Sequence, residues 1–433
     1  MKFPLVSRSR LEAESKQWRS RVAELKDRLE RAKARADRSK ARASEWKGRV
    51  DALNAQRNEW DSIRRKEGAW LRKVEDLCEV RAKEIEILRR ELREAEEANS
   101  QLLAQLVSGL PASREIDPGS RGTGARIPIV FGFDFEPDGR EVDRENPTWN
   151  GGVALLEQAE DFRDRLAKAS GQETVPLSWF LRADPQVELA QGSASWAFDR
   201  FSEQWQSLLA QGDELGLHMH PWRWDEEADR WRQDHADEEW LLHCLDVAID
   251  AYRDFMGRGP TSYRGGDRFF NAVVMRHLEK RGIKADFSLE RMKGGARLAN
   301  HELGAGAIPD HSRISPEAFW PSENDYRVPG PPRESGFGLL PLTSYPGGTL
   351  CPWMKPEDFA NALRFVLANS PRLTHLAFIA RTDLPLSDRW EGTCRNCEFL
   401  ARLVAEGRFE FVAATSAWER IQNSWNDSEP SGG

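Results

Sequence analysis

The stretch Gly212-Asp-Glu-Leu-Gly-Leu-His-Met-His-Pro-Trp222 carries two histidines, His218 and His220, at the end of an apolar run. Such a run after a Gly-Asp break predicts a buried strand, and alternate residues of a strand project to one face. We therefore expect both imidazoles to face the same way, where they can bind one cation such as zinc. The chain has 8 histidines in 433 residues, so two in three positions indicates more than background composition.

A second apolar segment, Ile127-Pro-Ile-Val-Phe-Gly-Phe-Asp-Phe-Glu-Pro-Asp138, ends in alternating acids. The acids are Asp134, Glu136 and Asp138, and the run before them predicts a buried strand. Carboxylates at the mouth of one strand and a histidine pair at the mouth of another form a plausible nitrogen and oxygen site for a metal ion.

Composition narrows the class of protein. No run approaches the roughly 18 apolar residues that span a bilayer, and the N-terminus lacks the apolar core of a secretory signal. Five cysteines do not form a disulfide framework, and the Cys394-x-x-Cys397 pair has no second pair or nearby histidine, which favours free thiols. These features predict a cytoplasmic protein without a transmembrane segment.

The first 107 residues predict a long helix. Apolar residues recur with 3-4 spacing from Leu11 to Leu106, without proline and between charged flanks, as in a coiled coil. At 1.5 Å per residue the helix would extend about 140 Å, and such a polar helix needs a partner. Its basic residues are interleaved with acids, so homo-oligomerisation is favoured over a solvated charged helix or an arm that binds a membrane or nucleic acid.

Residues 108–126 are rich in Gly, Ser and Pro and predict a flexible linker, and residues 423–433 predict a disordered tail. Between them, residues 127–422 alternate strands with helices, which predicts an α/β fold with a parallel sheet or barrel. Strands are expected at 127–135, 175–181, 215–220, 261–264, 285–288, 376–380 and 409–412. Helices are expected at 152–169, 196–210, 238–256, 271–281, 356–368 and 394–406, with a long insertion or active-site loop at 290–350.

Taken in order, these motifs resemble those of the polysaccharide deacetylases, the NodB-type enzymes of carbohydrate esterase family 4 and their relatives. The resemblance covers residues 127–420 and implies a distorted (β/α)7 barrel with its site at the strand ends. Phe133-Asp-Phe-Glu-Pro-Asp138 and Glu214-Leu-Gly-Leu-His-Met-His220 resemble the first two motifs. They imply Asp134 as general base and Glu136, His218 and His220 as ligands of a divalent metal, with zinc as the first expectation.

Tyr263-Arg-Gly-Gly-Asp-Arg-Phe-Phe-Asn271 and Gly282-Ile-Lys-Ala-Asp-Phe-Ser288 resemble the third and fourth motifs. The resemblance implies that Arg264 orients the base and that Asp286 belongs to the acid side. Substrate contacts are expected from Asp184, Trp222 and Asp267.

His375-Leu-Ala-Phe-Ile-Ala-Arg-Thr-Asp-Leu384 is placed like the fifth motif. Arg381, however, stands where the family has the histidine that acts as general acid. An arginine cannot give up a proton near neutral pH. Either another residue donates the proton, or Arg381 stabilises an oxyanion, or the domain does not catalyse.

Two function classes remain. The first is a hydrolase that removes N- or O-acetyl groups from a glycan, or from a lipid- or nucleotide-linked sugar. The second is an inactive glycan-binding or scaffold protein.

Overall fold

The computed structural model describes residues 126–292, 305–370, 372–383 and 389–426, together with individual residues between Arg19 and Gln101. The chain divides into two compact units, Met1–Leu106 and Val107–Gly433. The predicted linker lies outside the described residues, except for its last residue, and the proposed boundaries near 107 and 126 stay a prediction. Each unit is considered by itself.

In the first unit, described residues from two distant parts of the sequence pack together. Leu25, Leu29 and Leu88 are buried in one apolar cluster, with Val22 and Ile85 against it. Arg21 also lies 3.9 Å from Glu91. In a straight continuous helix, Leu25 and Leu88 would stand about 95 Å apart. The expectation of one such helix is therefore wrong for these residues, because each stretch finds its partner within its own chain.

The second unit is built on a mostly parallel sheet. Its main path runs β11 (Leu376–Arg381), β1 (Ile127–Phe135), β2 (Ser178–Arg182), β3 (Glu214–Met219), β6 (Ser262–Gly265), β7 (Ala285–Asp286) and β8 (Gly338–Leu339). An eighth strand, β12 (Phe409–Phe411), pairs with the first residues of β1. The chain after β8 reaches β11, because Thr343 N donates to Ala377 O at 3.0 Å. The sheet therefore curves into a distorted α/β barrel, as was predicted.

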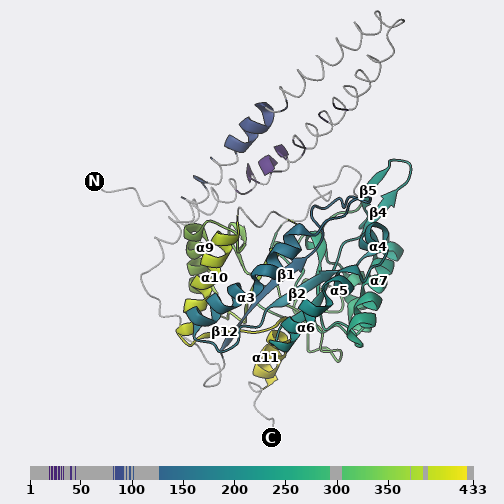
Figure 1. Cartoon of the computed structure of the whole chain (residues 1–433). Coiled ribbons are helices and arrows are strands. Elements are labelled where there is room, and N and C mark those ends of the chain that lie inside the picture. The colour runs from purple at the N-terminus through teal and green to yellow at the C-terminus, as the bar shows by residue number, and fades with distance from the viewer. Residues whose placement is uncertain are drawn as a thin grey trace, which may run out of the picture. The chain divides into compact units, whose positions relative to one another are not determined.

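Helices surround this sheet, with α9 and α10 on one flank and α4 and α7 on the other (Figure 1). They are α3 (Asn150–Ser170), α4 (Pro185–Gln191), α5 (Trp196–Arg200), α6 (Ser202–Ala210), α7 (Glu238–Met256), α8 (Ala272–Lys280), α9 (Pro356–Asn369), α10 (Trp390–Ala405) and α11 (Ala414–Asn426). No described helix is long and apolar enough to cross a membrane.

The structure differs from the sequence expectations in several places, and helices α4 and α11 were not among the expected helices. The predicted insertion at 290–350 contains β8, which is part of the barrel wall, and a small hairpin of β9 (Ser344–Tyr345) and β10 (Gly348–Thr349). A second hairpin, β4 (Trp222–Asp225) with β5 (Arg230–Gln233), follows the histidine pair. Helix α11 runs to Asn426, so the predicted tail is wrong for residues 423–426, and residues 427–433 lie outside the described part.

Large and small residues alternate in the barrel core. Phe180 on β2 is fully buried, and a Cβ on Gly132 of β1 or Gly216 of β3 would come within 2.9 Å of its ring. Trp418 and Ile421 of α11 belong to the same apolar cluster as Phe180. The helix that follows β12 therefore closes the apolar part of the barrel.

Candidate metal centre

The polar site continues the inward face of the barrel beyond its apolar core. Residues two apart on a strand share a face. On β1 the inward series runs through the core residues Val130 and Gly132 to Asp134, and Glu136 follows. On β3, Gly216 leads in the same way to His218 and His220. The two-residue alternation that places small and large side chains in the core therefore also places the carboxylates and imidazoles at the same end of the barrel.

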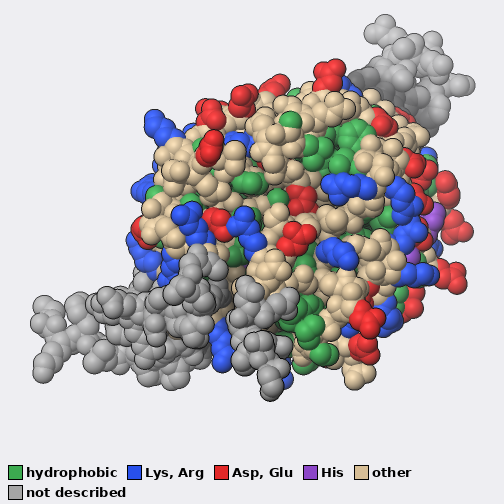
Figure 2. Space-filling view, turned by 90° about the horizontal axis from the view of Figure 1, so that it is seen from below, with side chains coloured by type: hydrophobic (Ala, Val, Ile, Leu, Met, Phe, Trp, Pro, Cys, Tyr) green, Lys and Arg blue, Asp and Glu red, His purple; other side chains and the backbone are tan. Residues whose placement is uncertain are grey.

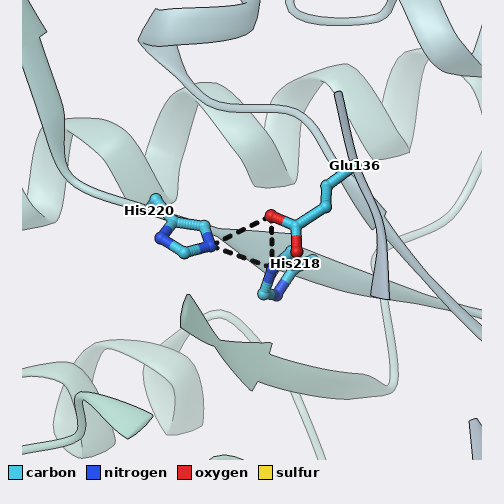
Figure 3. Close-up of side chains that lie close together, drawn as sticks. All are labelled: Glu136, His218 and His220. Carbon is cyan, nitrogen blue, oxygen red and sulfur yellow. Dashed lines mark hydrogen bonds and ion pairs between the residues drawn. The ribbon is translucent and has the colours of Figure 1, made fainter. Parts of the chain in front are cut away.

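Glu136, His218 and His220 converge on one point (Figure 3). Glu136 Oε2 lies 3.6 Å from His218 Nε2 and 3.3 Å from His220 Nε2, and the two Nε2 atoms are 3.2 Å apart. One ligand atom from each residue lies within 4.8 Å of the other two. All three side chains are buried, being no more than 2% exposed.

Hydrogen bonds fix which nitrogen of each imidazole faces this point. His218 Nδ1 lies 2.8 Å from the carbonyl oxygen of Arg264, and His220 Nδ1 lies 2.9 Å from Asp267 Oδ2. A carbonyl and an ionised carboxylate only accept, so each Nδ1 carries the proton. When both imidazoles are neutral, the Nε2 lone pairs therefore face each other at 3.2 Å, which is repulsive unless a proton or a metal ion lies between them. Nδ1 held by a carboxylate or carbonyl is the usual support of a metal-binding histidine.

The charged side chains around Glu136, His218 and His220 include more carboxylates than guanidinium groups. Ion pairs join six carboxylates to four guanidinium groups, namely Asp134, Glu136, Asp184, Asp267, Glu290 and Asp383 with Arg140, Arg182, Arg264 and Arg381. With neutral histidines the cluster carries two surplus negative charges, which a divalent cation would offset. Burial raises the pKa of Glu136, but contacts with both histidines and the charge of Arg381 outweigh it and hold that pKa well below its usual value.

Asp134 lies beside the triad and is held by one arginine. Arg264 Nε donates to both carboxylate oxygens of Asp134 at 2.9 Å, and Asp134 Oδ1 is 3.9 Å from His218 Nδ1. The guanidinium is itself fixed, because NH1 donates to Phe287 O at 2.9 Å and NH2 lies 3.6 Å from Glu290 Oε1. A carboxylate held in this way has a fixed orientation, as a general base requires.

The turn after β6 brings the backbone against His220. A Cβ on Gly266 would lie 2.3 Å from atoms of the His220 ring, so only glycine fits at that position. Asp267 and Arg268 then adopt positive φ values of 52° and 63°, which are unusual for side-chain-bearing residues and common at functional sites. In this conformation Asp267 also pairs with Arg140 and Gln233.

We expect Gly266→Ala to lower metal affinity by about 10- to 100-fold, the usual effect of disturbing the residues that orient metal ligands. The added methyl would displace the His220 ring, while the backbone of the turn can stay in place. Titration with zinc in a competing chelator would measure the change. Gly392→Ala is the control for a general cost of the substitution, since Gly392 lies in the first turn of α10 and its Cβ would meet nothing within 4 Å. Equal zinc affinity in both variants would contradict the assignment of His220.

Arg381 takes its place beside the triad at the end of β11. Its Nε lies 3.5 Å from Glu136 Oε1, and its NH2 pairs with Asp383. The side chain is 21% exposed, against 2% for Glu136. Burial and the nearby charge of Glu136 raise the pKa of Asp383 to about 6, although Arg381 opposes the shift. Arg381 therefore presents a fixed positive charge at the rim of the site.

Two of the expected substrate contacts, Asp184 and Trp222, are buried. Asp184 is fully buried and accepts hydrogen bonds from Gln186 N and Val187 N at the start of α4, from His220 N at 2.9 Å and from Arg182 Nε at 2.7 Å. It therefore supports the backbone of His220. Trp222 is 1% exposed and offers no open ring face to a sugar.

Asp267 and Asp286 also act through other residues. Asp267, expected to bind substrate, is occupied by His220, Gln233 and Arg140. Asp286, expected on the acid side, is fully buried, and burial raises its pKa to about 7. Asp286 accepts hydrogen bonds from Ser288 N and Ser288 Oγ, and Ser288 Oγ in turn accepts from Gly265 N at 2.6 Å. Asp286 thus holds the turn that carries Arg264 and Asp267.

Sequence reasoning missed four charged residues of the cluster: Arg140, Arg182, Glu290 and Asp383. Arg182 and Asp383 continue the inward series of their strands, two residues after Phe180 and Arg381 respectively, so strand alternation could have identified them. Arg140 and Glu290 lie outside the named strands and left no such signal. Asp138, the third acid of the first motif, instead accepts from Asn150 N and Gly151 N at the start of α3.

The face in Figure 2 carries Lys and Arg side chains interspersed with Asp and Glu. It shows no broad field of one sign, whereas a nucleic-acid-binding surface is strongly positive.

No family model matches the sequence, and no curated protein matches it. Among solved structures, the chain is similar to a putative polysaccharide deacetylase from Mycobacterium smegmatis, with 14% identity, a TM-score of 0.38, and coverage of 70% of this chain and 96% of the other. Peptidoglycan deacetylase PdaC from Bacillus subtilis gives 11% identity, a TM-score of 0.33, and coverage of 72% and 96%. A GH57-type branching enzyme from Pyrococcus horikoshii gives 10%, 0.38, and 71% of each chain. Similarity at this level carries no inference about activity, so the functional argument rests on the side chains.

Proposed function

We propose that this protein is a divalent-metal-dependent hydrolase that removes N- or O-acetyl groups from a glycan or a glycan precursor. The observation that carries the proposal is the pair of Nε2 lone pairs, facing each other at 3.2 Å with Glu136 beside them. Two imidazoles and one carboxylate form a three-ligand set, which leaves a coordination position open as in catalytic rather than structural sites. A carboxylate held by an arginine lies next to this set.

The chain's own residues then divide the work. Glu136, His218 and His220 would hold the ion, and zinc is the first candidate for two nitrogens and one oxygen. When bound, such an ion lowers the pKa of water and polarises a carbonyl group. Asp134 would accept the proton of the attacking water, with Arg264 keeping the carboxylate in place, and would pass this proton to the leaving nitrogen or oxygen as its bond to the acetyl carbon breaks. Arg381, at the rim beside Glu136, would stabilise the negative charge that develops on the acetyl oxygen.

Acetate release is the direct test. We expect the full chain, loaded with zinc, to release acetate from at least one member of a panel of N- and O-acetylated sugars that includes lipid- and nucleotide-linked forms. Metal content would be measured on the same sample. Metal binding and sugar binding without acetate release would favour the second candidate, a glycan-binding or scaffold protein, for which the fixed charge of Arg381 in place of a proton donor is the supporting observation.

Arg381→His separates the two roles considered for this position. If Arg381 stabilises the oxyanion, the change should lower kcat about a hundredfold, because a histidine that is neutral at pH 7 brings no fixed charge. Arg381→Lys is the matched control, since it keeps the charge and should lose less activity. An Arg381→His variant that is faster than the wild type would contradict the oxyanion role and indicate that a proton donor is needed at this position.

We also propose that the first unit mediates homo-oligomerisation and that the protein works in the cytoplasm on a lipid- or nucleotide-linked sugar. The first unit packs through apolar helical residues, which is how helices also associate between chains, although Leu25 and Leu88 already contact each other within one chain. Light scattering on the full chain and on a fragment from residue 127 would test it. Two monomeric samples would contradict the proposal.

A further inference from the structure

The charged cluster around the triad is sorted by depth. Among its described members, every carboxylate and the guanidinium groups of Arg182 and Arg264 belong to side chains that are at most 12% exposed. Arg140 and Arg381 differ, because 29% and 21% of their side-chain surface is exposed. Solvent therefore reaches positive charge at this site, and the acids lie behind it.

The two exposed guanidinium groups come from different loops that meet beside the triad. Arg140 follows β1, and Arg381 ends β11. Gly139 N donates to Asp383 O at 3.4 Å, which joins the two loops. Burial and the charge of Glu136 raise the pKa of Asp383 to about 6, and the charges of Arg381 and Arg140 both oppose this rise. Both arginines therefore lie near one carboxylate at the opening of the site.

Arg140 is held in this place and still has unused donors. Its carbonyl oxygen accepts from Gln186 Nε2 at 3.2 Å, and two residues later Val142 O accepts from Trp231 Nε1 at 2.7 Å. Its NH1 pairs with Asp267. In the described part of the chain, no group accepts a hydrogen bond from its Nε or NH2. A guanidinium group has five N–H donors, so most of those on Arg140 are available to a ligand.

Metal binding would leave this positive rim facing solvent. A divalent cation offsets the surplus negative charge of the buried cluster, so the bound site presents guanidinium groups to an incoming molecule. Arginine binds phosphate and carboxylate oxygens by charge-assisted hydrogen bonds, which are about twice as strong as those between neutral groups. The rim therefore matches an anionic ligand better than a neutral sugar.

We propose that Arg140 binds the phosphate group of a phosphate-linked acetylated sugar and so selects an anionic substrate. In a 2-acetamido sugar, the anomeric phosphate and the acetyl group are carried by neighbouring carbons. Two arginines that lie near one carboxylate can therefore contact both groups, Arg140 the phosphate and Arg381 the acetyl oxygen. The inference rests on the proposed function, because it names the substrate class of that site. Nucleotide-linked and lipid-linked sugars both carry this phosphate.

Calorimetry with a matched pair of sugars is the test. The parent is the zinc-loaded full chain carrying Asp134→Asn to prevent turnover, and the probes are N-acetylglucosamine 1-phosphate and the neutral methyl glycoside of N-acetylglucosamine. We expect the parent to bind the phosphate more tightly, with an affinity that falls as salt is added. In Arg140→Gln the affinity for the phosphate should fall about 10- to 100-fold, the effect of lost hydrogen bonds to a charged group, while the affinity for the neutral sugar stays unchanged.

Arg144→Gln is the matched control, because it removes the same charge four residues away. The Arg144 guanidinium lies 4.2 Å from the centre of the Trp224 ring and outside the cluster, so both affinities should equal those of the parent. Arg140→Lys keeps the charge and should retain most of the affinity for the phosphate. Metal content is measured on each variant, since Arg140 contacts Asp267, which orients His220.

Equal affinity of the parent for the two sugars, no binding of the phosphate, or an equal loss for both sugars in Arg140→Gln would each overturn the inference. Nucleoside diphosphate-linked and polyprenyl diphosphate-linked N-acetylglucosamine then distinguish the two sources of the phosphate, because the form with the natural linkage should bind more tightly than the 1-phosphate. Failure of the proposed function gives a different result. The zinc-loaded wild type would then bind the phosphate through Arg140 but release no acetate.

Discussion

Asp134→Asn should lower kcat about a thousandfold while KM and metal content stay close to those of the wild type. Loss of a general base typically removes a factor of about 10² to 10⁴ in rate. Asparagine has nearly the same shape as aspartate but cannot take a proton from water. The metal should remain, because Glu136, His218 and His220 form the ligand set without Asp134. Arg264 should also stay in place, since it retains Phe287 O and Glu290.

The chain offers a matched control for this change four residues away. Asp138 belongs to the same acidic segment, but its carboxylate accepts from Asn150 N and Gly151 N at the start of α3. The asparagine amide has one acceptor oxygen, so Asp138→Asn should lose one of these two hydrogen bonds, which costs about 1 kcal/mol of stability, and should leave kcat nearly unchanged. Initial rates of acetate release and metal analysis of both variants would decide. Wild-type turnover in Asp134→Asn would remove Asp134 from the mechanism.

The fold was largely predictable because its elements carry strong local patterns. Helix α7 matches the prediction at both ends, since Asp237 caps it and Gly257 closes it in the left-handed conformation. The predicted strands reappear with shifts of a few residues at their ends. Strand β8 was not predicted, because its two residues, Gly338 and Leu339, lie in a Gly- and Pro-rich stretch and form a strand only through pairing with β7.

The long N-terminal helix shows another limit of pattern reading. A repeat of apolar residues indicates that helices pack along that seam, but the pattern is the same whether the partner is another chain or a distant part of the same chain. Leu25 against Leu88 is the second case. Only contacts across the sequence, which periodicity does not contain, distinguish the two.

The residues of the proposed metal site were predictable, while the roles of the surrounding residues were not. His218 and His220 are two apart on a strand, so local geometry alone directs them to one face. The role of Asp184, by contrast, depends on its partners. The guanidinium of Arg182, two residues earlier, and the amide of His220, from the next strand of the sheet, both donate to its carboxylate. A carboxylate at a strand end can contact either substrate or the protein, and only the completed packing shows which.

The His218→Ala, His220→Ala double variant should lose bound zinc altogether, from about one ion per chain to none that survives dialysis. Glu136 alone cannot replace a three-ligand set, and four-coordinate zinc sites rely on such sets. Since the ion binds only the folded protein, chelator should lower the unfolding temperature of the wild type but not of this variant. The helical circular dichroism should persist, because neither histidine lies in a helix. The control is His243→Ala, His277→Ala, a change of equal size in α7 and α8, which should keep the zinc. Full zinc occupancy in the His218, His220 variant would place the ligands elsewhere and remove the basis of the proposed hydrolase.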